Sequence, residues 1–345
     1  MYFQNLEIMK PTDFAKYISG FLTKYLPNEK GASRNTIASY RDTLILLINF
    51  IQVEKMIKVE KITLDTVTRE TILEFLAWLQ RERECSVSTG NSRLAAIHSF
   101  YKYLQYENLE YIHEYQRILS IKFKKTSIEN VNYLTVEGIK LILLQPDVTN
   151  RRGRRDLTLL SLMYDTGARV QEIIDLTPSM LRLDNPMTIK VIGKGNKARI
   201  VPMLDAQVEH LKNYLKENRL NESFASNYPL FNNNKKEKLT RAGVNHILQK
   251  YANAARVVNP TIIPQKVSCH SFRHSKAMHL LQAGVNLVYI RDILGHVSIQ
   301  TTEIYARADS KQKRLALEKA YVDVHPDEKP MWTENDNLLS WLKSF

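Results

Sequence analysis

Residues 269–309 read CHSFRHSKAMHLLQAGVNLVYIRDILGHVSIQTTEIYARAD, and this stretch decides how the rest of the chain is interpreted. It contains His270 and Arg273 in the spacing H-x-x-R, His296 directly after a Leu-Gly pair, and Tyr305 nine residues later. Apolar residues recur at helical spacing, which predicts helices over 271–284, 286–296 and 298–308. Cations, imidazoles and a phenol gathered in so short a segment favour chemistry on a phosphate group.

Two upstream segments add further cations to this set. Arg169 lies in DTGARVQEI (165–173), and Lys194 lies in VIGKGNKARIVPM (191–203). Residues 188–192 and 198–201 flank a Gly-Lys-Gly-Asn turn and predict a β-hairpin, with Gly193 and Gly195 supplying the turn conformations. Lys194 is therefore expected at the tip of a hairpin.

A phosphodiester is attacked only if its negative charge is neutralised as the transition state forms. Guanidinium stays charged and grips two non-bridging oxygens with a fixed fork, so Arg169 and Arg273 are the predicted clamp. Tyr305 is the candidate nucleophile for a covalent step. A phenol is a weak nucleophile near neutral pH, and His270 is the candidate base that takes its proton.

The remaining members of the set have supporting roles. Lys194 could protonate the leaving 5′ oxygen, and the imidazole of His296 could hydrogen-bond the same phosphate. Glu172 follows Arg169 by three residues on one helical face and could hold the arginine or a histidine in place. The protein's own cations supply the charge, so the sequence predicts neither a metal nor a cofactor.

Each residue also has a plainer interpretation. The chain has 17 tyrosines, most of which must be structural, and a single arginine or turn lysine is usually solvated. His274 and His279 are expected to be packing residues. His270 and His274 are four apart but lack the acidic residue of an H-E-x-x-H zinc site. Cys269 is expected to be a small buried residue rather than a thiol nucleophile.

The composition is that of a globular, basic protein. The chain has 345 residues, 44% of them hydrophobic, and a formal net charge of +13, with a pI near 9.5. This charge favours a polyanionic partner, with nucleic acid ahead of an acidic membrane surface. No apolar run is long enough to span a bilayer, and the N-terminus lacks a secretory signal. Cys85 and Cys269 are expected to be free thiols, which suits a cytoplasmic protein.

The sequence predicts two domains joined by a linker. Residues 1–122 are expected to form a helical domain, with helices in 33–52, 68–82 and 92–108 and a cap at Ser33 or Thr36. Residues 123–132 are polar and basic and are the predicted linker. Residues 133–320 are the predicted catalytic domain, with helices over 136–145, 156–176 and 245–257, and residues 321–345 are a C-terminal tail. The fold class is mainly α with a small antiparallel β-sheet.

The motifs resemble a known family. GARVQEI, VIGKGNKARIVP, HSFRHSKA and LGHVSIQTTEIYA are similar to those of the tyrosine recombinases, or lambda integrase family, and closest to its Xer-like branch. The likeness covers nearly the whole chain. It implies an N-terminal core-binding (SAM-like) domain and an α/β catalytic domain.

The resemblance also implies a mechanism. Tyr305 would form a 3′-phosphotyrosyl bond and release a 5′ hydroxyl. Arg169, Arg273 and His296 would bind the scissile phosphate, Lys194 would be the general acid, and His270 would assist proton transfer, with Glu172 at the family's acidic position. Family members assemble as four protomers on two DNA sites, exchange strands through a Holliday junction, and use neither ATP nor metal.

The partner implied is double-stranded DNA with specific target sites. Phosphate contacts are expected from basic residues of both domains, and base contacts from the helical domain. The candidates are Arg34, Asn35, Tyr40, Arg41, Asn91, Arg93, Lys122, Lys124, Lys125, Arg151, Arg152, Arg154, Arg155, Arg241 and Asn245. For each of them a solvated helix face is the plainer alternative.

Several biological roles stay open at this point. The 40 residues after Tyr305 favour a recombinase that integrates, excises or transposes a mobile element, acting as a homotetramer or with related recombinases. The apolar residues around Trp332, Leu338, Trp341 and Phe345 would dock in trans or pack on their own domain. The alternatives are Xer-type chromosome dimer resolution, DNA relaxation like that of a type IB topoisomerase, and DNA binding without catalysis.

Overall fold

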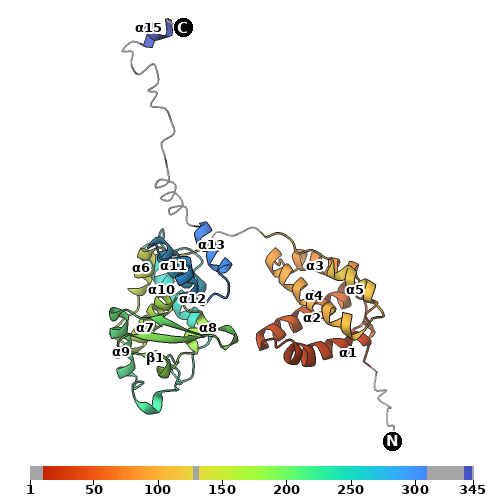
Figure 1. Ribbon diagram of the computed structural model, residues 1–345, viewed down its shortest axis with the longest axis horizontal. Coiled ribbons are helices and arrows are strands. Elements are labelled where there is room, and N and C mark those ends of the chain that lie inside the picture. Colours follow the sequence, from red (N-terminus) through yellow and green to blue (C-terminus); the bar gives the residue numbers. More distant parts are fainter. Residues whose placement is uncertain (1–10, 127–131, 309–337, 344–345) are drawn as a thin grey trace. The chain divides into compact units, whose positions relative to one another are not determined.

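The computed structural model describes residues 11–126, 132–308 and 338–343. Contacts divide the chain into two compact units, Met1–Ile128 and Glu129–Phe345, and each is described by itself (Figure 1). Both units consist mainly of helices, and the second also contains a small antiparallel sheet. This confirms the predicted fold class. No helix in the described part of the chain is long and apolar enough to cross a membrane.

The first unit is entirely helical where it is described. Ser33 caps the long helix α2 by accepting a hydrogen bond from the backbone N–H of Thr36, as one of the two predicted caps. Ser86 caps α4 in the same way, so that helix begins at Val87, earlier than predicted. The elements are α1 (Asp13–Gly20), the π-helix η1 (Phe21–Glu29), α2 (Arg34–Glu54), η2 (Val59–Lys61), α3 (Arg69–Arg81), α4 (Val87–Glu107) and α5 (Ile112–Leu119).

Aromatic side chains fill much of the core of this unit. Phe21 is fully buried and meets Phe100 edge-on, with ring centroids 5.3 Å apart. Such pairs add to the burial of apolar area, which is worth about 25 cal/mol per Å². The core thereby fixes α2 and α4, the helices that carry most of the predicted base-reading residues.

The second unit packs helices against one face of a three-stranded sheet (Figure 1). Ile189, Val191 and Val201 are buried on that face, whereas Lys190 and Ile200 are exposed. The strands lie in the order β1-β2-β3, all antiparallel, and Ile189 pairs with Val201 across the hairpin. The predicted hairpin is confirmed, and β1 is an additional short strand. The elements are α6 (Val136–Leu143), α7 (Arg151–Thr166), α8 (Val170–Ile174), η3 (Pro178–Met180), β1 (Leu181–Arg182), β2 (Thr188–Ile192), η4 (Lys194–Asn196), β3 (Ala198–Pro202), α9 (Asp205–Glu217), η5 (Ser223–Ala225), α10 (Arg241–Val258), α11 (Cys269–Gln282), α12 (Leu287–Leu294), α13 (Gln300–Ala308) and α15 (Leu338–Lys343).

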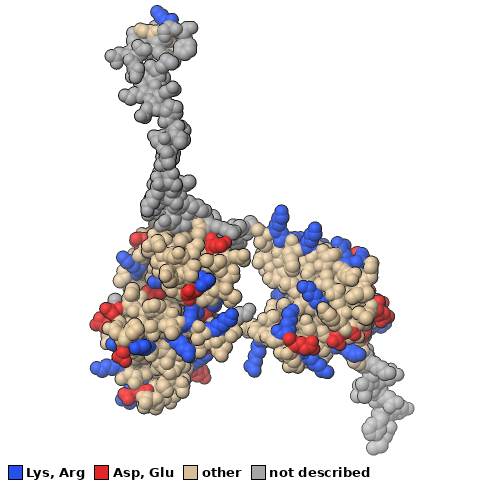
Figure 2. Space-filling view, in the orientation of Figure 1, with Lys and Arg blue, Asp and Glu red and all other residues tan. Residues whose placement is uncertain are grey.

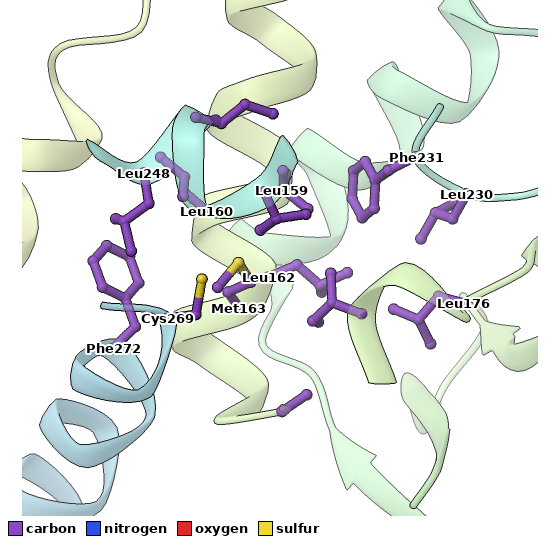
Figure 3. Packing of buried hydrophobic residues seen from close by; sticks show 14 of the residues in the cluster. Leu159, Leu160, Leu162, Met163, Leu176, Leu230, Phe231, Leu248, Cys269 and Phe272 are labelled. Carbon is purple, nitrogen blue, oxygen red and sulfur yellow. The ribbon is translucent and has the colours of Figure 1, made fainter. Parts of the chain in front are cut away.

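Helix α7 is central to the core of the second unit. Its residues Leu159, Leu160 and Met163 are almost completely buried. They belong to one apolar cluster with Leu248 of α10 and Phe272 of α11 (Figure 3). Packing on both neighbours fixes the C-terminal end of α7 and the N-terminal half of α11 relative to each other.

The predicted helical pattern over 156–176 is interrupted, and the prediction of a continuous pattern is wrong at this point. Gly167 ends α7 with a φ of 56°, in the left-handed region that glycine adopts most easily. A Cβ there would lie 2.7 Å from a methyl group of Leu294, so the close approach of α12 also requires glycine. The turn starts a new helix, α8, with Arg169 at its N-cap.

Candidate functional site

The candidate site lies where short elements of the second unit meet. Helices α7, α12 and α13 all contact α11, and α12 also contacts β3. These elements carry Arg169 at the start of α8, Arg273 and His274 on α11, His296 after α12 and Tyr305 on α13. The structure therefore brings together residues that are up to 136 positions apart, from Arg169 to Tyr305.

Glu172 organises two guanidiniums. One carboxylate oxygen accepts a hydrogen bond from Arg169 Nη1 at 2.8 Å, and the other accepts from the Arg169 backbone N–H and from Arg199 Nη2, both at 2.8 Å. Burial raises the pKa of Glu172, but these hydrogen bonds outweigh burial and the pKa lies below its ordinary value. The carboxylate thus stays ionised and fixes both cations. This geometry matches the predicted supporting position of Glu172.

Arg199 is a site residue that the sequence analysis missed. Its side chain is largely buried, and its Nε also donates to the carbonyl of Ile293 at 2.7 Å. It lies on β3 opposite Val191, within the same hairpin motif as Lys194. A charged residue in a strand otherwise rich in apolar residues was the available signal.

Arg273 is held by the ends of two helices. Its Nη1 donates to the carbonyl of Gly167 and its Nη2 to the carbonyl of Leu294, both at 2.7 Å, and its exposed fraction is 4%. Burial and the nearby charge of Arg169 lower its pKa to about 10, so the group remains a cation at neutral pH. Two fixed hydrogen bonds leave the other donors of the fork preorganised for an anion.

His296 is neutral at ordinary pH. Burial and the charges of Arg273 and Arg169 lower its pKa to about 4. The Nδ1 atom hydrogen-bonds the hydroxyl of Thr302, which is fully buried, at 2.8 Å. The imidazole stacks on the ring of Tyr305 with centroids 6.3 Å apart. Because Thr302 engages Nδ1, Nε2 is the atom left for a phosphate oxygen.

Tyr305 is buried in the core of its own chain. Its exposed fraction is 1%, and it packs with Met278, Ile290 and Leu294. Burial raises the pKa of the phenol, and the positive charges of Arg273 and Arg169 offset only part of that rise. The hydroxyl therefore stays protonated in this arrangement and requires a base to become a nucleophile.

The contact of that hydroxyl corrects one expectation. The phenol oxygen lies 2.8 Å from Nδ1 of His274, so the prediction that His274 only packs is wrong. Burial and the neighbouring His270 and Arg273 lower the pKa of His274. In the tautomer of neutral imidazole that carries its proton on Nε2, the Nδ1 atom of His274 accepts a hydrogen bond from the phenol. H-x-x-R-H places two histidines on one helix, and only the structure tells which of them meets Tyr305.

We expect His274 and Tyr305 to be energetically coupled. His274→Phe should destabilise the protein by about 1–3 kcal/mol, because it leaves a buried hydroxyl without an acceptor. In a Tyr305→Phe background the same change should cost about 1 kcal/mol less, because the hydroxyl is already gone. Urea unfolding of the four proteins measures this coupling.

His270→Phe is the matched control. His270 lies one turn from His274 on the same helix, with an exposed side chain. His270→Phe should lower the free energy of unfolding by the same amount in the unchanged protein and in the Tyr305→Phe background. Strict additivity of His274→Phe and Tyr305→Phe would contradict the coupling.

His270 and Lys194 are the two remaining predicted catalytic residues. Partial burial and the charges of Arg273 and Arg169 lower the pKa of His270, which makes it neutral and able to accept a proton. Lys194 begins η4 at the hairpin turn, and its side chain lies outside what the structure describes. The turn itself is close to the site, since a Cβ on Gly193 would lie 3.1 Å from Glu172 Oε1. The roles of both residues stay predictions.

The thiol near the site is not a competing nucleophile. Burial raises the pKa of the free Cys269 thiol to about 11, so it is not a thiolate at neutral pH. Within the described segments no group of three or more His, Cys, Asp or Glu is placed to hold a metal ion.

The predicted DNA-contacting residues of the first unit differ in exposure and in the contacts of their side chains. Arg34, Asn35 and Arg41 are exposed on α2, whereas Tyr40 stacks on Phe21 with ring centroids 6.2 Å apart. Other candidates have internal partners. Asn91 exchanges two hydrogen bonds with the backbone of Lys124, and Arg93 Nη1 donates to Ser39 and Thr43 of α2. Lys122 and Lys125 are exposed.

In the second unit Arg241 lies beside the candidate site. Its Nε donates to the side chain of Gln171 on α8 at 2.7 Å, and Asn245 is exposed one turn later on α10. Lys and Arg side chains gather over the region of α8 and the strands (Figure 2). DNA contacts by all of these residues stay predictions.

A site of three fixed guanidiniums, a neutral imidazole and a buried phenol is typical of enzymes that act on phosphodiesters. Two family models match the chain: "Phage integrase family" over residues 132–312 and "Phage integrase, N-terminal SAM-like domain" over residues 18–108. The chain therefore belongs to the phage integrase family of tyrosine recombinases.

Similar proteins agree with this assignment. The chain is 33% identical to y4rC of Sinorhizobium fredii, whose name describes an integrase/recombinase, over 335 residues that cover 97% of this chain and 99% of that one. It is 33% identical to the tyrosine recombinase XerD of Staphylococcus haemolyticus, covering 88% and 96%. Its fold is similar to that of XerH bound to difH substrate, with a TM-score of 0.64, 23% identity and coverage of 88% and 85%. It is also similar to that of the Tn1549 transposon integrase bound to transposon right end DNA, with a TM-score of 0.65, 17% identity and coverage of 88% and 98%.

Proposed function

We propose that this chain is a site-specific recombinase that cleaves and rejoins double-stranded DNA through a 3′-phosphotyrosyl intermediate. The observation that carries the proposal is the position of the Tyr305 phenol beside the guanidiniums of Arg169 and Arg273 in one unit. Fixed cations stabilise the charge that develops on a phosphate during attack, without a metal or an external energy source.

The proposed step conserves atoms and charge. The Tyr305 oxygen attacks phosphorus, and the bond from phosphorus to the 5′ oxygen breaks. His270 or His274 takes the phenol proton, and Lys194 gives a proton to the leaving 5′ oxygen. Arg169, Arg273 and His296 hold the non-bridging oxygens. In the reverse step a 5′ hydroxyl from another strand attacks the phosphotyrosine and releases Tyr305.

We also propose that four protomers act together on two DNA sites and exchange strands through a Holliday junction, in the cytoplasm. A mobile-element role is favoured because the match to y4rC extends over 97% of the chain. XerD and XerC relatives at 33% identity support chromosome dimer resolution as the second candidate.

Recombination between two sites tests the proposal directly. DNA fragments that flank the gene would first be screened for binding to the protein. Those that bind would be cloned in pairs into a supercoiled plasmid, and the plasmid would be incubated with the protein in EDTA. We expect an excised or inverted product that requires both sites. Relaxed plasmid without recombinants, produced by a monomer, would instead favour the topoisomerase alternative.

A further inference from the structure

The second unit contains a basic pocket that no step of the proposed reaction uses. Its volume is about 920 Å³, within the usual range for sites that bind small molecules. It lies at the N-terminal end of α7, whereas the candidate site meets the C-terminal end, where Arg273 contacts Gly167. A helix rises 1.5 Å per residue, so α7 separates the two by roughly 20 Å.

Cations outnumber carboxylates in the pocket lining, where Glu217 is the acidic residue and is also near Arg151. Arg151, Arg152, Arg219 and Lys236 line it, and none of these four pairs with a carboxylate within 4.0 Å in the described part of the chain. Glu217 also lines it, but this carboxylate already pairs with Arg154. The uncompensated charge lies at the positive end of α7, which strengthens the attraction for an anion.

Two of these cations occupy unusual backbone positions. Arg219 has a φ of 55° and Lys236 a φ of 60°, in the left-handed region that favours glycine or asparagine. Both residues lie in tight turns, Arg219 in the turn that ends α9 and Lys236 in the turn closed by its N–H to the carbonyl of Asn233.

The lining also has parts suited to a flat heterocycle. Phe224 and Tyr228 line the pocket, with exposed fractions of 63% and 54% and ring centroids 6.1 Å apart. Large aromatic faces left in water beside unpaired guanidiniums are typical of sites that stack a base and bind its phosphates. Asn218, Asn232, Asn233 and Asn234 complete the lining, but the amides of Asn218 and Asn233 already have hydrogen-bond partners within the protein. Asn232 and Asn234 are therefore the amides offered to a base edge, where an amide can both donate and accept.

We propose that this pocket binds a nucleotide unit, with the phosphates on Arg151, Arg152 and Arg219 and the base against Phe224 and Tyr228. No bond is broken there. The same chemistry is offered by a free nucleoside triphosphate and by a nucleotide within a single strand. An acidic peptide shares the charge but not the base, so it is the competing class.

The test uses the full-length protein and three probes: ATP, inorganic triphosphate and an oligomer of glutamate. Calorimetry should give ATP binding that Arg152→Ala plus Arg219→Ala weakens at least about tenfold, because charge-assisted hydrogen bonds are lost. Phe224→Ala should weaken ATP about five- to tenfold, as expected for a lost stacking contact, and leave inorganic triphosphate unchanged. That difference separates base recognition from simple anion binding.

The same binding measurement serves for the control variants and for deciding whether the nucleotide is free or part of a strand. Lys235→Ala removes an exposed cation next to the lining, and Tyr106→Ala removes an exposed aromatic of the other unit; both should bind ATP normally. A twelve-residue thymidine oligonucleotide would then be added as a competitor of ATP. Competition that disappears in the pocket variants would show that the bound nucleotide belongs to a single strand, whereas no competition would show that the ligand is a free nucleotide. The proposal would be overturned if Phe224→Ala weakened the binding of ATP and of inorganic triphosphate equally, or if the protein bound the glutamate oligomer more tightly than ATP. Tyr305→Phe should bind ATP normally, so this outcome is independent of recombination.

Discussion

Tyr305→Phe should abolish covalent capture of DNA while leaving DNA binding intact. The substitution removes one oxygen, and the ring keeps its packing against Met278, Ile290 and His296. The nearby Cys269 thiol is a poor substitute for the lost nucleophile, because burial raises its pKa to about 11 and it is not a thiolate near neutral pH. The measurement is a nicked suicide duplex incubated in EDTA, followed by denaturing electrophoresis.

The appropriate control is another buried tyrosine of the same unit. Tyr214 is 3% exposed, and its hydroxyl donates to the carbonyl of Leu230 at 2.9 Å. Tyr214→Phe loses a comparable hydrogen bond far from the cation cluster in sequence, and it should still form the adduct. An adduct that persists in Tyr305→Phe would show that the nucleophile is a different residue.

The buried state of Tyr305 bears on how cleavage begins. Its hydroxyl is occupied by His274 and shielded from solvent, so a phosphate must displace or join that contact. His274 is neutral at ordinary pH because its pKa is lowered, and it can accept the proton that the phenol gives up. This arrangement makes His274 a second candidate base beside His270.

The sequence was sufficient for features set by local patterns. The cap at Ser33 and the hairpin around Gly193 and Gly195 follow from side-chain chemistry and turn preferences of a few neighbouring residues. Arg169, Arg273, His296 and Tyr305 also lie within electrostatic range of one another, as the resemblance to the recombinase motifs implied.

The contacts that the sequence did not indicate depend on tertiary packing. Whether His270 or His274 meets Tyr305 depends on the rotation of α11 against α13. The role of Arg199 appears only when β3 lies against α8 and α12. The helix break comes from the left-handed φ of Gly167, and the close approach of Leu294 from α12 leaves no space for a side chain at that position.

Arg273→Ala should lower the rate of covalent capture about 10²–10³-fold, as expected when one preorganised donor to a developing charge is removed. The loss should fall on the cleavage step, because the guanidinium is held before DNA binds by the carbonyls of Gly167 and Leu294. Single-turnover cleavage of the nicked duplex at saturating protein measures it. Arg273→Lys keeps the charge but loses the planar fork, so it should recover only part of the rate.

A second arginine that is held by backbone carbonyls serves as a control that separates a loss of stability from a loss of cleavage rate. Arg256 donates to the carbonyls of Pro264 and Gln265 at 2.6 and 3.1 Å, in the same way that Arg273 bridges two carbonyls. Arg256→Ala should therefore cost stability in urea unfolding but cleave at the normal rate once folded. If the folded Arg273→Ala protein cleaves at a rate within about threefold of the unchanged protein, Arg273 is not part of the phosphate clamp. Loss of a donor that stabilises the transition state should lower the rate far more than threefold. In that case Arg169 and Arg199, which share the carboxylate of Glu172, would be the pair left to neutralise the phosphate.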